Sequence, residues 1–319
     1  MGSCKIDVNN PFLVAYNRIL VPVAGSGLAE SAALRACGSE RVYPLQEMPA
    51  GPWDGPGGEE LTAEVRAEPG QSEGRRRLAV ALDLRPAETL SLEPAAEVAL
   101  PPSPIRVERG EWQALTIRNG PRHVRVPTRL DPAQAPPGPL LEAGDERHAG
   151  LSTTMWEGAA LPTSLDTRIE AEGPCAVQWR CVYRWPDDSS ATFVFRWVAN
   201  SDTLLIAEHI SADHEAALVW RPFAPALANA LIGGGGERRG RLRPLTPPAH
   251  RQRDLEQDGR CLLRHLGHIA YFNQWNLAWV GFQHAAPEAE GDEPFVGVFT
   301  GWGAQWRRRG HMRLELWQE

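Results

Sequence analysis

The feature that most constrains the fold is the regular alternation of side chains in the stretch VQWRCVYRWPDDSSATFVFRWVANSDTLLIAEHI, residues 177–210. Side chains of a β-strand point to opposite faces with a period of two, so a shared parity of apolar residues predicts a strand with one apolar face. A turn rich in Pro, Asp and Ser at 186–190 separates the first run from an alternating run at 193–197 and an aliphatic strand at 203–210. The stretch therefore predicts an antiparallel meander with one buried face. The apolar residues of the first run are Val177, Trp179, Cys181, Tyr183 and Trp185.

The rest of the chain favours short strands and turns over helices. It has 319 residues, with 30 glycines and 28 prolines, and its length suits one large domain or two ordinary ones. The expected fold class is all-β, with a small N-terminal barrel or sandwich over residues 1–105 and a large antiparallel, supersandwich-like β-sandwich over residues 106–319. The segment EVALPPSPIRVERGE, residues 97–111, is expected to link the two because its prolines cannot donate to a sheet.

Two shorter motifs predict local structure. Asn119-Gly120, between two short apolar runs, is typical of a β-hairpin turn. The glycine run at 233–236 and the basic segment at 237–254 are expected to form a mobile connection, followed by closing strands.

Composition argues against several partners. No apolar run reaches the roughly 18 residues that span a bilayer, so no membrane segment is expected. Residues 1–12 lack the basic and hydrophobic regions of a secretory signal, which leaves the location unknown and cytoplasmic by default. The net charge is −7, whereas a nucleic-acid-binding protein usually carries a clustered basic face, so no nucleic-acid partner is expected.

No cofactor or metal is expected either. Lys5 is the only lysine, so Schiff-base and phosphate-loop lysine chemistry has no residue to use beyond the N-terminal tail. The glycine-rich AGSGLAE and GGGGERRGR complete neither a dinucleotide-binding nor a P-loop motif. The five cysteines have no zinc spacing and are expected to be free thiols: Cys4, Cys37, Cys175, Cys181 and Cys261.

Tryptophan is the residue type that points to a function. The chain has 12, and those of the meander are expected to fill the core, whereas the last part of the chain interleaves tryptophan with Asn, Gln, Arg and His. An indole face can stack on the C–H face of a sugar while such polar groups bond its hydroxyls, and an apolar wall with a few polar groups is typical of a ligand site. The candidate sugar-binding residues are Asn273, Trp275, His284, Trp302, Trp306 and His311.

Catalytic groups are harder to assign. Glycoside hydrolysis needs two carboxylates that converge across a cleft, and Glu157 and Glu208 are candidate acids. The acidic pair at 187–188 is better explained by its turn. A lyase would need a base beside an arginine that neutralises a carboxylate, and the residues available for those roles are His284, His311 and Arg313.

The meander resembles the β-supersandwich, or galactose-mutarotase-like, domain of carbohydrate-active enzymes. The resemblance also covers the first hundred residues, which are similar to the small barrel that precedes this domain in bacterial polysaccharide lyases, such as exo-acting rhamnogalacturonan lyases. Those enzymes carry in addition a large helical toroid that supplies much of the catalytic cleft, and no helical stretch of that size is found here. No catalytic residue can therefore be carried over. The resemblance rests on Tyr183, Asp188, Phe195, Arg196, Asn200, Ser201, Leu205 and His209.

The function expected is that of a carbohydrate-binding β region in a bacterial polysaccharide-processing protein, such as the non-catalytic front end of a lyase or glycoside hydrolase. Its partner would be an oligosaccharide or polysaccharide, together with an additional helical domain or further copies of the chain in a homo-oligomer. Two alternatives stay open: a complete sugar-active enzyme, either lyase or epimerase, and a structural or assembly subunit without sugar binding.

Overall fold

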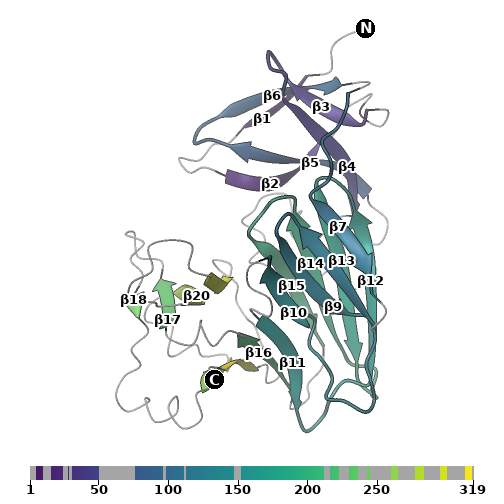
Figure 1. The fold of residues 1–319 in the computed structure, drawn as a ribbon, viewed down its shortest axis with the longest axis vertical. Coiled ribbons are helices and arrows are strands. Elements are labelled where there is room, and N and C mark those ends of the chain that lie inside the picture. Colours follow the sequence, from purple (N-terminus) through teal and green to yellow (C-terminus); the bar gives the residue numbers. More distant parts are fainter. Residues whose placement is uncertain are drawn as a thin grey trace.

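A computed structural model gives the fold of the chain (Figure 1). It describes residues 5–9, 16–23, 28, 31–49, 76–95, 98–110, 113–146, 152–211, 216–222, 230–235, 243–244, 260–264, 277–283, 295–299 and 313–317, and beyond residue 218 it describes the backbone of the strands. Within these residues nearly all regular structure is β-strand, which confirms the all-β fold class.

The first six strands form one curled sheet in the order β1-β6-β3-β4-β5-β2. The sheet is nearly closed, like a barrel, and its two edge strands β1 and β2 follow each other in the chain (Figure 1). The strands are β1 (Ile6–Asn9), β2 (Tyr16–Val23), β3 (Ala33–Ala36), β4 (Val42–Pro49), β5 (Arg76–Leu84) and β6 (Thr89–Ala95). The interior is mostly aliphatic and contains Val23, Leu28, Leu34, Ala36, Tyr43, Leu45, Val80, Leu82, Leu84 and Leu92.

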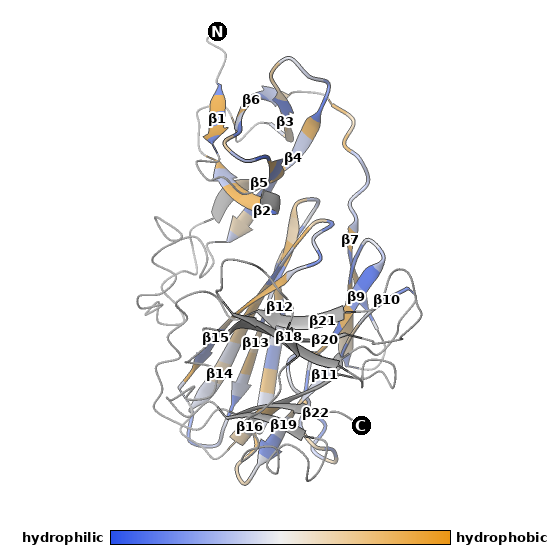
Figure 2. Ribbon diagram, turned by 90° about the vertical axis from the view of Figure 1, so that its left-hand side faces the viewer, coloured by the Kyte–Doolittle hydropathy of each residue, from blue (hydrophilic) through white to orange (hydrophobic). Residues whose placement is uncertain are grey.

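Two further sheets pack face to face as a β-sandwich, with one core between them. The larger sheet has the order β19-β22-β16-β11-β10-β9-β8-β7, and the smaller has the order β12-β13-β14-β15. Hydrophobic and hydrophilic residues follow one another along β12, β13 and β14 in Figure 2. The larger sheet contains β7 (Ile105–Arg109), β8 (Ala114–Asn119), β9 (Arg122–Pro127), β10 (Glu142–Asp145), β11 (Ser152–Gly158), β16 (Ala216–Pro222), β19 (Arg260–Arg264) and β22 (Arg313–Trp317). The smaller contains β12 (Ser164–Glu172), β13 (Ala176–Arg184), β14 (Ser190–Val198) and β15 (Leu204–Ile210).

A fourth, smaller sheet lies in the last third of the chain, with the order β18-β17-β20-β21. Its strands are β17 (Ala230–Gly235), β18 (Arg243–Pro244), β20 (Leu277–Gln283) and β21 (Phe295–Phe299).

The meander of the sequence prediction is confirmed as β13, β14 and β15, paired antiparallel throughout. Trp179, Trp185 and Trp197 are all buried, which confirms their place in the core. The prediction of a single buried face was too simple, because Gln178 and Arg196 on the opposite face are only 1% and 3% exposed. The six-stranded sheet covers part of that face.

The turn between β13 and β14 has the chemistry that its residues predicted. Ser189 donates from both its backbone N and its Oγ to Asp187 Oδ1, at 3.1 and 2.6 Å. Asp188 has φ = 65°, a left-handed conformation that Asp tolerates better than most residues. The hydrogen bonds to Asp187 and the left-handed backbone of Asp188 explain both acidic residues by the turn, without a catalytic role.

The hairpin at Asn119-Gly120 is also confirmed, with Asn119 ending β8 and Gly120 at φ = 61°. Asn119 does more than end a strand, because its side chain is fully buried and bonds the opposite sheet. Its Nδ2 donates to the carbonyl oxygen of Val198 at 2.8 Å, and its Oδ1 accepts from the backbone N of Asn200 at 2.7 Å. The hairpin turn therefore ties the two sandwich sheets together at one end.

Two local predictions need correction, and one closing strand has a direction that the sequence left open. The second half of the expected linker is the edge strand β7, because the prolines end at Pro104 and Ile105 then points into the core. The glycine run is not a free connection, since Gly233 and Gly234 are paired in β17 with β20. The closing strand β22 pairs parallel to β16, although the rest of its sheet is antiparallel.

One buried amide joins the six-stranded sheet to the sandwich. Gln46 of β4 accepts at Oε1 from the backbone N of Cys175 and of Ala176, at 2.8 and 2.9 Å, and donates from Nε2 to the Ala176 carbonyl at 2.8 Å. Gly173 lies against this amide, where a Cβ would come within 2.6 Å of the Gln46 Cδ. The junction is therefore tight and fully hydrogen-bonded, while the division of the chain into two domains near residue 105 stays a prediction.

Candidate functional site

All six predicted sugar-binding residues lie outside the described residues: Asn273, Trp275, His284, Trp302, Trp306 and His311. The strands that flank these residues in the sequence are described, and their positions in the sheets can be given. Trp275 precedes β20 and Trp302 follows β21, and these two strands are antiparallel neighbours in one sheet. His284 follows the other end of β20, and His311 precedes β22, which belongs to the larger sandwich sheet. The strands next to the two tryptophans are thus neighbours in one sheet, whereas the strands next to the two histidines belong to different sheets.

Aromatic residues and glycine alternate along β21 at one parity, and its neighbour β20 has Trp279 and Gly281 at the paired positions, with Gly281 also paired to Ile232 of β17. Trp279 of β20 pairs with Gly234 on one side and with Phe299 on the other. Two residues further along β20, at the same parity, Gly281 pairs with Gly297. Glycine weakens a strand and often marks a place where a ligand or another backbone approaches closely.

The candidate acids do not form a pair on one strand or sheet. Glu157 lies on β11 in the larger sandwich sheet, and Glu208 lies on β15 in the smaller one. Convergence of these two carboxylates across a cleft therefore stays a prediction. Among the described residues there is also no group of three His, Cys, Asp or Glu side chains placed to hold a metal ion.

The described part of the chain also bears on membrane contact. No helix within it has the length and the hydrophobicity needed to cross a bilayer.

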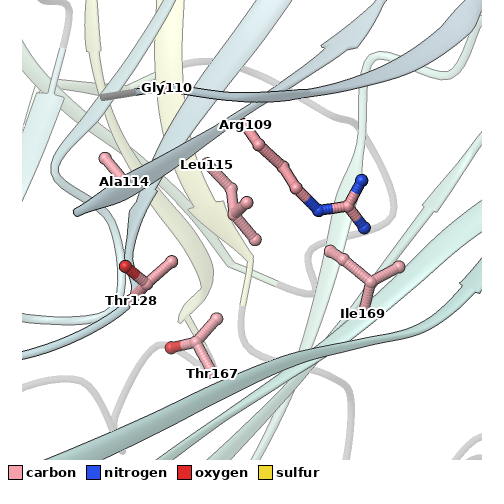
Figure 3. A pocket seen from close by; sticks show the side chains of 7 residues that line it. All are labelled: Arg109, Gly110, Ala114, Leu115, Thr128, Thr167 and Ile169. Carbon is pink, nitrogen blue, oxygen red and sulfur yellow. The ribbon is translucent and has the colours of Figure 1, made fainter. Parts of the chain in front are cut away.

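A cavity of about 410 Å³ opens at one end of the sandwich, between the β7–β8 hairpin and β12 (Figure 3). Arg109 and Gly110 are exposed at its rim, so the cavity reaches solvent. Leu115 and Ile169 provide an apolar wall. The lining residues are Arg109, Gly110, Ala114, Leu115, Thr128, Thr167 and Ile169.

Of the polar side chains in this cavity, one is hydrogen-bonded to the protein and two are not, within the described residues. Thr167 Oγ1 donates to the Pro127 carbonyl oxygen at 2.7 Å and so bridges the two sheets. Within the described residues, by contrast, neither the Arg109 guanidinium nor the Thr128 hydroxyl forms a hydrogen bond or ion pair. The cavity therefore offers one cation and one hydroxyl whose hydrogen-bonding capacity is unused.

The nearest thiol offers no nucleophile. Cys181 Sγ lies 3.5 Å from Thr167 Oγ1, and burial raises the pKa of Cys181 to about 12. A thiol with that pKa stays protonated near neutral pH, and only a thiolate attacks efficiently. Cys181 is therefore not expected to form a covalent bond with a ligand in the cavity.

The sequence reasoning missed this cavity, although one signal for it was present. Leu165, Thr167 and Ile169 share one parity of β12, and Leu165 and Ile169 pack against the sandwich core. A threonine between two core-facing aliphatic residues marks a place where the core turns polar. Which residues of other strands meet it cannot be read from a single strand.

Comparison with known proteins adds no relative. No model of a known protein family matches the chain, and none of the curated proteins matches it.

Proposed function

We propose that the chain binds carbohydrate through the aromatic residues of its last fifty positions, as the binding region of a polysaccharide-processing protein. The observation that carries this proposal is the register of Trp279, which pairs with a glycine on one side and an aromatic residue on the other. A sugar ring stacks on an indole only where neighbouring side chains leave the ring face open, and glycine has no side chain to cover it.

The separate roles of the tryptophans also support it. Trp156, Trp179, Trp185 and Trp197 are buried in the sandwich core, so packing alone accounts for them. The C-terminal tryptophans instead stand among polar residues in the sequence. Their polar neighbours Asn273 and Gln274 in the sequence are of the types that bond sugar hydroxyls.

The strand ends add a geometric reason. Because β20 and β21 are antiparallel, the start of β20 and the end of β21 lie at the same end of the sheet. Trp275 comes just before that point in the sequence and Trp302 just after it. Trp275, Trp279 and Trp302 are therefore the residues we assign to one stacking surface.

The test is a glycan array followed by calorimetric titration with the best glycan. We expect saturable binding that Trp302→Ala and Trp279→Ala each weaken by about 2 kcal/mol, or roughly thirtyfold in Kd, which is typical of a buried aromatic anchor. Trp53→Ala is the matched control, a tryptophan from the first hundred residues, and should leave Kd unchanged. Circular dichroism spectra of all variants must match that of the wild type.

Two results would overturn the proposal. Binding that survives both C-terminal substitutions would place the site elsewhere, and an array without any saturable glycan would exclude carbohydrate binding. A large homo-oligomer in light scattering together with an empty array would instead support an assembly subunit. Release of a new reducing end or an unsaturated product from the bound glycan would identify a complete enzyme.

A further inference from the structure

The cavity at the end of the sandwich is lined by polar residues at core-facing positions. Along β7, Ile105 and Val107 pack on the core, and Arg109 has the same parity. Along β9, Val124 and Val126 are core residues, and Thr128 follows at the same parity.

On β12, in the opposite sheet, Thr167 lies at a core-facing position between Leu165 and Ile169. Strands from both sheets therefore each place one polar residue at a core-facing position beside the cavity. These three residues, Arg109, Thr128 and Thr167, all line one cavity.

Figure 3 shows how the chemistry is distributed within the cavity. The Arg109 side chain extends toward Ile169, and the two threonines lie together on the side away from the guanidinium. Leu115 lies between these two polar regions. A ligand that uses the whole cavity would thus need an anionic group at one end, an apolar middle and a hydrogen-bonding group at the other end.

We propose that this cavity is a binding site for a small organic carboxylate that carries a hydroxyl or amide group at its far end. Guanidinium is planar and always charged, and its fork of donors matches a carboxylate. The Thr128 hydroxyl can donate or accept, and the Thr167 hydroxyl, which already donates to Pro127, can still accept. This site does not depend on the carbohydrate site, since it shares no residue with it.

The volume sets the size of the ligand. A cavity of about 410 Å³ lies at the lower end of the range for small-molecule sites. A six-membered ring with one substituent at each end fits within it, with the ring against Leu115 and Ile169 and room left for water. Para-hydroxybenzoate has this shape and charge and is the probe we choose, and para-hydroxybenzamide is its neutral isostere.

The experiment is calorimetric titration of the full chain with both probes at low ionic strength. We expect para-hydroxybenzoate to bind with a Kd of about 1 mM or tighter and para-hydroxybenzamide to bind at least about tenfold more weakly, because a hydrogen-bonded charge pair is lost. Added salt should weaken binding of the carboxylate and not of the amide.

Two arginine variants locate the site. Arg109→Gln should weaken binding of the carboxylate about tenfold or more and should leave binding of the amide unchanged. Arg106→Gln is the matched control, because Arg106 is exposed on the same strand at the opposite parity. Thr128→Val, which keeps the shape of the side chain, should weaken both probes by roughly threefold to tenfold.

The outcomes that overturn the proposal are distinct. Equal affinity for the acid and the amide would show that Arg109 recognises no carboxylate. Equal loss in Arg109→Gln and Arg106→Gln would reduce the effect to general surface charge. No saturable binding of para-hydroxybenzoate would mean that the cavity is only a solvated end of the sandwich.

Discussion

The core of the six-stranded sheet and the core of the sandwich are filled by different kinds of side chain. The first is aliphatic apart from Tyr43. The second contains four tryptophans, and its rings contact one another directly: Trp179 stacks on Phe195 with centroids 4.9 Å apart, and Trp156 meets Tyr183 edge-on at 5.4 Å. A curled sheet encloses a narrow interior, whereas two packed sheets lie about 10 Å apart and need larger groups to fill the space.

The aromatic side chains of the sandwich core bring polar atoms into it, and some of these are not hydrogen-bonded. The Nε1 atoms of Trp185 and Trp197 donate to the carbonyl oxygens of Ala160 and Ser201, at 3.0 and 2.9 Å. Within the described residues, three other polar atoms of the sandwich core form no hydrogen bond of good geometry, although Trp156 and Tyr183 interact with each other: Trp156 Nε1, Trp179 Nε1 and Tyr183 Oη. Rings thus fill the wide core well but bring donors into it that the packing does not satisfy.

The largest expected effect comes from removing a ring from the sandwich. Trp179→Ala should lower the free energy of unfolding by about 3–5 kcal/mol, because it deletes the stacked contact with Phe195 and leaves a cavity. Urea denaturation followed by circular dichroism measures this. Leu82→Ala in the six-stranded sheet is the matched variant and should cost about 2–4 kcal/mol. A loss below about 1 kcal/mol for Trp179→Ala would contradict the packing described above.

The junction between the two regions should be the next most sensitive place. Gln46→Ala leaves two backbone N–H groups and one carbonyl without partners, and we expect a loss of about 2–3 kcal/mol in the free energy of unfolding. Gln134, whose amide bonds Asp131 on the surface, is the control, and Gln134→Ala should change stability by less than about 0.5 kcal/mol. Equal effects would mean that water replaces the Gln46 amide without cost.

Removing an unsatisfied group should stabilise the sandwich. Tyr183→Phe deletes a buried hydroxyl that forms no hydrogen bond of good geometry within the described residues, and we expect a gain of about 1 kcal/mol in the free energy of unfolding. The corresponding change in the aliphatic core, Tyr43→Phe, should be close to neutral by the same thermal or urea measurement. Destabilisation by Tyr183→Phe would show that the hydroxyl is satisfied, for example by a buried water.

The smallest expected effect is a change in stability above pH 9 that comes from the Cys175 thiol at the junction of the two regions. Burial raises the pKa of Cys175 from its ordinary value of 9.0 to about 11. Below pH 9 the thiol is protonated in both states, so its contribution is constant. Between pH 9 and pH 11 the unfolded chain releases this proton and the folded chain keeps it, so stability falls as pH rises. Cys175→Ala should flatten the decline of melting temperature over this range, and an unchanged slope would contradict the shift.

The meander could be predicted from the sequence because a period of two is a local signal. β13 and β14 are neighbours in the chain, their turn has clear chemistry, and the tryptophan parity points to the core. β7 was missed because the prolines before it dominated the segment. β17 was missed because glycine has low strand propensity, which pairing with β20 overrides.

Contacts between distant segments are what local patterns could not reveal. The cavity arises where inward positions of β7, β9 and β12 come together, and each of these segments taken alone shows only one polar residue beside the cavity. The predicted sugar-binding residues were chosen by type and not by position, and the strands next to them belong to two different sheets. Strand pairing shows that Trp275 and Trp302 flank strands of one sheet, whereas His311 flanks a strand of another sheet.

The parallel pairing of β22 with β16 has a consequence for how the protein is made. Every strand of the barrel-like sheet is complete by Ala95, so that sheet can form while the ribosome is still translating the sandwich. The larger sandwich sheet is different, because β22 lies between β16 and β19 and is translated after both. Until residue 317 has left the exit tunnel, the free edge of β16 stays open to other strands, and nascent chains would need protection from pairing with one another there.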